Sequence, residues 1–179
     1  MHTYIALFRG INVGGTGSLP MKELVTLLQD LGCREVRTYI QSGNAVFAST
    51  EADAGRLAAA IGTEVKSRRG FEPKVLLLTR AEFEQAAAAN PFPEAESDPQ
   101  TLHLGFLAAE PPDPNLEAIE KLRAASERWQ LIGRVFYLYA PEGIGRSKLA
   151  TVSERLLGVP MTDRNWRTVQ AVADMAREI

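Results

Sequence analysis

Short apolar runs alternate with amphipathic stretches over the first 80 residues. The apolar runs, several of them rich in β-branched or aromatic side chains, predict strands at residues 3–8, 35–40, 44–48 and 73–79. Between them, apolar residues recur every three or four positions, which predicts helices at residues 20–31 and 54–69. The resulting order, β-α-β-β-α-β, is that of the ferredoxin-like split βαβ unit.

The rest of the chain repeats this pattern in part. After a first helix, the hydrophobic periodicity predicts the order β-α-β-β-α, with strands at residues 101–108, 129–132 and 135–140. A final helix has apolar positions from Trp166 to Ile179. We therefore expect an α+β fold of two ferredoxin-like (split βαβ) halves with antiparallel sheets and C-terminal helices. The expected subdomains are residues 1–80 and a βαββα-like part with the C-terminal helix at 81–179.

A glycine-rich loop follows the first strand and precedes the first helix. It has the sequence Arg9-Gly10-Ile11-Asn12-Val13-Gly14-Gly15. In a split βαβ unit the first two strands run in the same direction, so this loop and the turn at residues 41–44 should lie at the same edge of the sheet. We expect the side chains at that edge to converge, namely Arg9, Asn12, Ser42 and Asn44.

The glycine loop matches neither of two well-known phosphate-binding motifs. It lacks the Gly-Lys-Ser/Thr of a Walker A loop, and its glycines miss the spacing of the dinucleotide fingerprint. Two interpretations stay open. The backbone N–H groups around Gly14 and Gly15 could bind phosphate, or the glycines could serve a purely structural turn.

A second group of candidate residues lies near the C-terminus. Arg164, Asn165 and Trp166 are expected at the start of the final helix, where the exposed N–H groups favour anions. The alternative is that Asn165 only caps the helix and Trp166 belongs to the core. Our hypothesis is that Arg164 and Arg9 jointly bind an anion. Lys148, at the start of another helix, is a further candidate for ligand binding.

Composition excludes several classes of protein. The chain has 179 residues and a formal net charge of −2, which argues against a general nucleic-acid-coating protein. One cysteine excludes a disulfide framework, and two histidines with one cysteine do not make a metal site, so we expect no metal and no cofactor. Neither a signal-like N-terminus nor a membrane-length apolar run is present, so we expect a cytoplasmic protein without membrane contact.

Catalytic residues are not recognisable in the sequence. Ser42 could be a nucleophile, but neither His2 nor His103 is placed beside it as a base. His103 is expected to be a solvated or hydrogen-bonded strand residue. Tyr4 and Phe47 lie on the first and third strands, where RNA-recognition modules carry stacking aromatics, but the rest of that signature is absent.

Five spaced motifs together carry a resemblance to a known family. They are the glycine loop, Tyr39-Ile40-Gln41-Ser42-Gly43-Asn44, Asn90-Pro91-Phe92, Ser147-Lys148-Leu149 and Thr162-Asp163-Arg164-Asn165-Trp166. In this order the chain resembles, over essentially its whole length, the bacterial family of domain of unknown function 1697. The chain departs from the family pattern at two positions. Cys33 stands where the family is expected to have an aromatic residue, and Asp163 stands where a small residue is usual. The resemblance implies a compact bacterial α+β protein and supplies no activity.

The function we expect is the binding of a small anionic ligand that carries a phosphate or carboxylate group. The candidate ligand-binding residues are Arg9, Asn12, Gly14, Gly15, Ser42, Asn44, Lys148, Arg164, Asn165 and Trp166. The sequence does not decide whether the protein is an enzyme, nor its oligomeric state. The alternatives, which we favour less, are a nucleic-acid-binding module and a structural or interaction protein.

Overall fold

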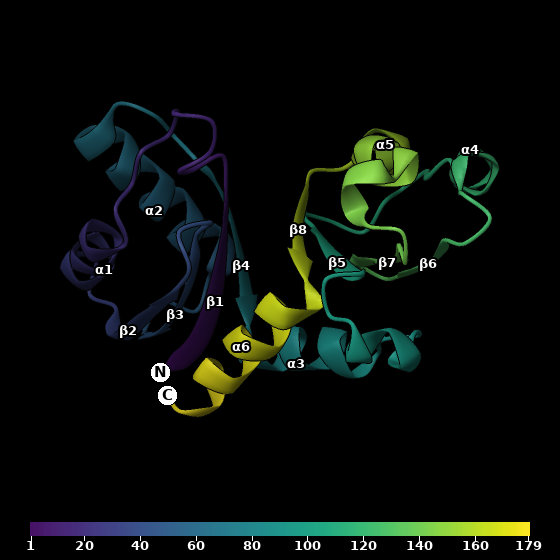
Figure 1. The fold of residues 1–179 in the computed structure, drawn as a ribbon. Helices are drawn as coiled ribbons and strands as arrows, with labels where there is room; N and C mark the ends of the chain where they lie inside the picture. Colours follow the sequence, from purple (N-terminus) through teal and green to yellow (C-terminus); the bar gives the residue numbers. More distant parts are fainter. The chain divides into compact units, whose positions relative to one another are not determined.

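The first sheet has the strand order β2-β3-β1-β4, and every neighbouring pair is antiparallel (Figure 1). The computed structural model describes residues 1–179. The elements of this part are β1 (His2–Arg9), α1 (Met21–Asp30), β2 (Arg34–Tyr39), β3 (Asn44–Ser49), α2 (Ala54–Arg69), β4 (Lys74–Thr79) and α3 (Arg80–Ala88). This is the predicted β-α-β-β-α-β order.

Helices α1 and α2 cover one face of this sheet (Figure 1). Their apolar stripes pack on alternate residues of the two central strands, namely Tyr4, Ala6, Phe8, Ala45 and Phe47. Ile5 and Leu7 point to the opposite face and are also fully buried. Burial on both faces explains why β1 is a continuous apolar run rather than an alternating one.

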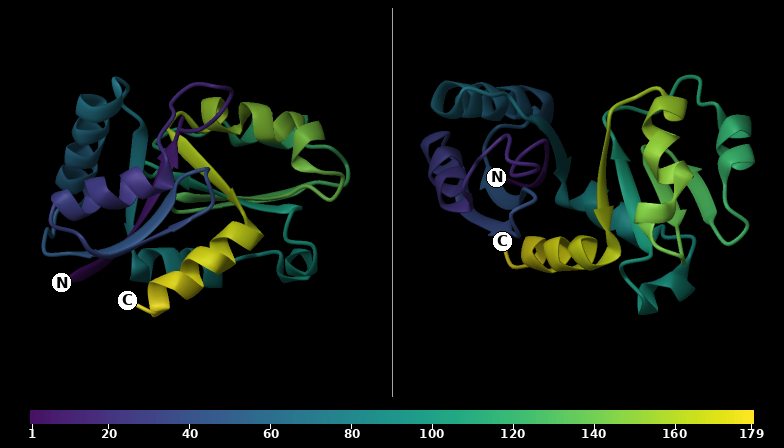
Figure 2. Two further views of the ribbon diagram at one scale, coloured as in Figure 1. Left: turned by 60° about the vertical axis from the view of Figure 1, so that its left-hand side comes forward. Right: turned by 45° about the horizontal axis from the view of Figure 1, so that its top comes forward.

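The second sheet repeats this topology with the order β6-β7-β5-β8. Two helices, green in Figure 2, lie on one face of it, and their residues Ile119, Leu149 and Leu157 pack against Phe136 and Leu138. The helical elements here are the 3-10 helices η1 (Pro93–Ser97) and η2 (Ile144–Arg146), with α4 (Leu116–Leu122), α5 (Lys148–Leu157) and α6 (Trp166–Arg177). The strands are β5 (Leu102–Leu107), β6 (Arg128–Ile132), β7 (Val135–Tyr139) and β8 (Met161–Asn165).

Strand β8 corrects the expected βαββα-like order of the second half, which is a complete β-α-β-β-α-β unit. Four of its five residues are the polar Thr162, Asp163, Arg164 and Asn165, so it has neither the apolar run nor the alternation that predicts a strand. It forms because its backbone pairs with β5 at the edge of the sheet. Backbone pairing of this kind does not depend on side-chain pattern.

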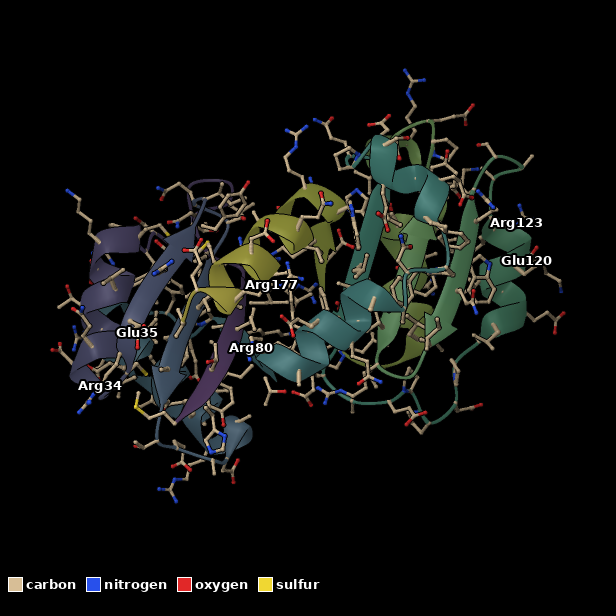
Figure 3. All side chains as sticks on the ribbon, turned by 90° about the horizontal axis from the view of Figure 1, so that it is seen from below. Arg34, Glu35, Arg80, Glu120, Arg123 and Arg177 are labelled. Carbon is tan, nitrogen blue, oxygen red and sulfur yellow. The ribbon has the colours of Figure 1, made fainter.

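The edge strand β2 is irregular at its start. The pairing of β2 with β3 shifts between Arg34 and Arg37, and Glu35 has a φ of +53°. Figure 3 shows Arg34 and Glu35 at this end of the strand. Bulges and charged residues at a sheet edge oppose pairing with further strands.

The chain divides into two compact units, which we call the first and the second unit. The first comprises Met1–Gln85 and Gln170–Ile179, and the second comprises Ala86–Val169. The last residues of the chain therefore group with the N-terminal unit, and the domain division predicted after residue 80 stays a prediction. No helix of the chain is both long enough and apolar enough to span a bilayer.

Candidate functional site

The glycine loop between β1 and α1 folds into a small hairpin. The amide of Thr16 donates to the carbonyl of Val13 at 3.1 Å, and the two residues form an isolated antiparallel bridge. Gly14 and Gly15, between them, have φ of +61° and +76°. Positive φ at both central positions is the geometry of a type I′ turn, which glycine adopts without steric cost. The turn accounts for both glycines, and their role in ligand binding stays a prediction.

The side chain of Asn12 fastens this hairpin to the turn between β2 and β3. Its Nδ2 donates to the carbonyls of Leu19 at 2.8 Å and Gln41 at 2.9 Å, while its Oδ1 accepts from the amide of Leu19 at 2.8 Å. The expected contact between the glycine loop and the 41–44 turn is therefore confirmed. It follows from topology, since β1 and β2 both run antiparallel to β3.

The turn after β2 is itself closely packed against the end of β1. The amide of Phe8 donates to the carbonyl of Gly43 at 2.9 Å. A Cβ atom at Gly43 would lie 2.5 Å from Cδ1 of Ile11, so only glycine fits there. Asn44 is buried, and its Nδ2 lies 3.3 Å from Oγ of Ser42, which is exposed. Nδ2 of Asn44 also donates to the carbonyl of Tyr39 at 3.0 Å, so Asn12 and Asn44 both hold backbone.

Two cations face each other where β1 ends. Arg9 is paired in register with Lys74, the first residue of β4, and both are exposed. Directly opposed residues of an antiparallel pair project from the same face of the sheet, about 5 Å apart at Cβ. Lys74 was not among the predicted site residues, because only the register of β4 brings it to Arg9.

The other predicted residues stand where β8 passes into α6. Oδ1 of Asn165 accepts from the amide of Thr168 at 3.0 Å and so caps the helix. Trp166 is buried, and its Nε1 has no hydrogen-bond partner. Nη1 of Arg164 donates to the carbonyl of Asp163 at 2.8 Å. Burial lowers the pKa of Arg164 to about 10, although the carboxylate of Asp163 acts in the opposite direction.

His103, on β5, is buried and pairs with the exposed Asp163, a partner that sequence reasoning missed. Its Nδ1 lies 2.7 Å from Oδ2 of Asp163, and its Nε2 lies 3.0 Å from the carbonyl oxygen of Gln100. The carbonyl and an ionised carboxylate both accept hydrogen bonds, so this arrangement favours the doubly protonated ring, in which both nitrogens donate. Burial by itself lowers the pKa of His103, but the Asp163 carboxylate and the Gln100 carbonyl outweigh it and raise the pKa above 6.5. With both nitrogens engaged, the ring is not placed to act as a base.

A polar pocket of about 430 Å³ opens beside this pair, where β5 begins and β7 and β8 end. Its wall includes Thr101, His103, Glu142, Ile144 and Asn165. It therefore brings one predicted residue, Asn165, next to the missed His103. No group of three or more His, Cys, Asp or Glu side chains is arranged to hold a metal ion.

Comparison with known proteins places the chain in a family. The profile described as "Protein of unknown function (DUF1697)" matches residues 1–137. The chain belongs to the DUF1697 family. The solved structure of a conserved bacterial protein, SP0830 from Streptococcus pneumoniae, is similar, with a TM-score of 0.75 and 27% sequence identity over 98% of each chain. No curated protein matches.

The predicted site residues of this DUF1697 chain fall into two groups. The first unit holds Arg9, Asn12, Gly14, Gly15, Ser42 and Asn44, and the second holds Lys148, Arg164, Asn165 and Trp166. Lys148 is exposed and begins α5 directly after Ser147, whose Oγ caps that helix. The hypothesis that Arg9 and Arg164 share one anion stays a prediction.

The two aromatics considered for base stacking are not on an open face of the sheet. Tyr4 and Phe47 pack in the core beneath α1 and α2, with their ring centroids 6.2 Å apart. The hydroxyl of Tyr4 donates to the carbonyl of Glu51 at 2.9 Å. In this DUF1697 chain neither ring is accessible to a nucleic-acid base.

A pair of glycine substitutions tests the packing of the glycine loop. A Cβ at Gly17 would lie 2.2 Å from the carbonyl oxygen of Gly10, whereas a Cβ at Gly14 meets no atom within 4 Å. Both residues have positive φ. We expect Gly17→Ala to lower the free energy of unfolding by about 2–4 kcal/mol and Gly14→Ala by about 1 kcal/mol. Urea denaturation measures the free energy of unfolding of both variants. Equal losses would contradict the close approach of Gly17 to the Gly10 carbonyl.

A second test uses the pH dependence of stability. Because the folded-state pKa of His103 is raised, its stabilisation is complete below its unfolded pKa, about 6.5, and is lost as pH rises through the folded value. The free energy of unfolding of this DUF1697 protein should therefore fall over that window. We expect His103→Gln to remove this fall in the free energy of unfolding. His2→Gln, at an exposed position, should keep it. Chemical denaturation at a series of pH values measures the slope, and an unchanged profile in His103→Gln refutes the pairing.

Proposed function

We propose that the loop edge of the first unit binds a small ligand through a phosphate or carboxylate group. By loop edge we mean the glycine loop, the 41–44 turn and the facing residues Arg9 and Lys74. The observation that carries the proposal is the register of β1 and β4, which sets these two cations directly opposite each other. Two positive charges gathered at the same end of the sheet attract a small anion.

The chemistry around the two cations supports an anionic ligand. Arg9 offers a planar fork of donors suited to carboxylate or phosphate, and Lys74 offers a compact charge. Lys74 makes no ion pair within the chain. The exposed residue Ser42 lies on the adjoining turn, which Asn12 holds in place. Polar groups on rigidly connected loops are a common basis for ligand recognition.

The nucleic-acid alternative has less support. Base stacking on the first sheet would need accessible aromatic rings, and those of Tyr4 and Phe47 are buried. The net charge of the chain is −2, so a long polyanion gains little from the protein as a whole. We therefore favour a small anion, bound locally, over a polynucleotide.

Removing the charge of Lys74 tests the proposal. We expect inorganic phosphate to bind wild-type protein measurably in isothermal titration calorimetry at low ionic strength, and Lys74→Gln to weaken that binding about fivefold through loss of a nearby partly exposed charge. Lys22→Gln is the matched control, since it removes one positive charge from the exposed side of α1 in the same unit.

Three results would count against the proposal. Absence of any phosphate binding by the wild-type protein would refute it. Equal weakening by Lys22→Gln and Lys74→Gln would indicate a diffuse effect of net charge rather than a site. Tighter binding of a single-stranded oligonucleotide, with affinity falling steeply as salt is added, would favour the nucleic-acid alternative.

A further inference from the structure

The outer strand of the second sheet, β6, has one open edge. It pairs only with β7, in the sheet order β6-β7-β5-β8 (Figure 1). The amide of Ala140, directly after β7, donates to the carbonyl of Thr101 on the β5 side. Backbone groups of a strand alternate between its two neighbours, so Tyr137 is directed to β6, where its partner in register is Gln130.

The residues on either side of Gln130 direct their backbone away from β7. These are Trp129 and Leu131, whose N–H and C=O groups point to the open edge. The groups have no hydrogen-bond partner within the chain. Side chains along β6 alternate between exposed and half-buried, so no residue of the strand is buried. An open edge of this kind is a template for a further strand.

The equivalent edge of the first unit is protected and β6 is not. Strand β2 has a shift in register, a positive φ at Glu35 and two further charged residues, Arg34 and Arg37. Strand β6 pairs with β7 without a shift from Arg128 to Ile132, and none of its residues has a positive φ. Its charged residue, Arg128, stands at its first position. The same topology thus opposes strand pairing at one edge and permits it at the other.

Exposed apolar side chains border the open edge. Ile132, at the end of β6, is 38% exposed, and Leu116, at the start of α4, is 41% exposed. Leu116 precedes Glu120 by one helical turn, so the two lie on the same side of α4. Glu120 accepts from Nε1 of Trp129 at 2.8 Å, which shows that this side faces β6 (Figure 3). A strand added at the edge would remove this apolar surface from water.

We propose that β6 is the contact between two copies of this chain, which pair antiparallel about a two-fold axis through Gln130. A second copy fits because β6 is complementary to itself. In this register the two strands overlap over their full length, and the open groups of Trp129 meet those of Leu131 in the second copy. Arg128 lies opposite Ile132 of the second copy, so like charges do not oppose each other.

The size and symmetry of the contact determine how it is tested. A pair of short edge strands buries little surface beside the roughly 1,200–2,000 Å² of a stable complex, so we expect a weak dimer with a Kd of about 10–100 μM. Gln130 faces Gln130 of the second copy as a non-hydrogen-bonded pair, with Cβ atoms about 4.5–5.5 Å apart. A charge at this position meets itself across the axis.

Sedimentation velocity of the full chain measures the dimer. We expect wild-type protein to pass from monomer to dimer between about 10 μM and 1 mM. Gln130→Lys and Gln130→Glu, each measured alone, should dimerise about tenfold more weakly, because like charges oppose. An equal mixture of the two should recover at least the wild-type affinity, because opposite charges then meet. The matched control is Val13→Lys with Val13→Glu, at an exposed residue of the first unit, where mixing should change nothing.

Amide hydrogen exchange gives a second readout. The N–H groups of Trp129 and Leu131 should gain protection as the protein concentration rises, whereas that of Gln130, already bonded to β7, should change less. A wild-type monomer at every concentration overturns the inference, including the case in which β6 instead binds a strand of another protein. A dimer whose affinity the Gln130 mixture does not restore, or which leaves Trp129 and Leu131 unprotected, forms at another surface and overturns it too.

Discussion

The register of β1 between β3 and β4 is the constraint on which the first unit depends. Tyr4, Ala6 and Phe8 lie under the helices, while Ile5 and Leu7 are buried on the other face. A slip by one residue would exchange the two sets and break the packing of both faces, so the register is strongly determined. The same register sets Leu7 opposite Asn44 and Arg9 opposite Lys74. The candidate site is therefore a direct consequence of how the core is aligned.

Hydrogen bonds of one side chain then connect the loops that this register brings together. Asn12 satisfies backbone groups on both sides of the junction, and each such bond contributes about 1 kcal/mol. The loops carry an unusual amount of left-handed backbone, with Asn12 and Ile40 in addition to the glycines. Glycine relieves steric conflict where chains approach closely, as at Gly17 and Gly43. Ile40 has its positive φ directly before Gln41, whose carbonyl accepts the hydrogen bond from Asn12 that joins the two loops.

The second unit has the same topology but brings different chemical groups together. Its edge strand β8 is polar, and it brings Asp163 to the buried ring of His103. The charged form of this buried ring is favoured because a carboxylate and a carbonyl accept hydrogen bonds from its two N–H groups. The pair therefore joins β5 to β8 electrostatically, beside a polar pocket that Asn165 also lines. Charged groups on neighbouring strands are thus found in both units. They are two cations in the first unit and a histidine with a carboxylate in the second.

The amino-acid sequence determined the strand and helix order of the first unit, and from that order the meeting of the glycine loop with the 41–44 turn. Both follow from periodicity and chain direction, which are local properties. The capping role of Asn165 could also be predicted, because a cap acts within one helical turn. Strand β8, the partner of His103 and the position of Lys74 could not be predicted. A polar edge strand such as β8 forms through backbone pairing, which leaves no pattern in the side chains. The neighbours of His103 and Lys74 depend on strand register, so only the tertiary structure decided these three features.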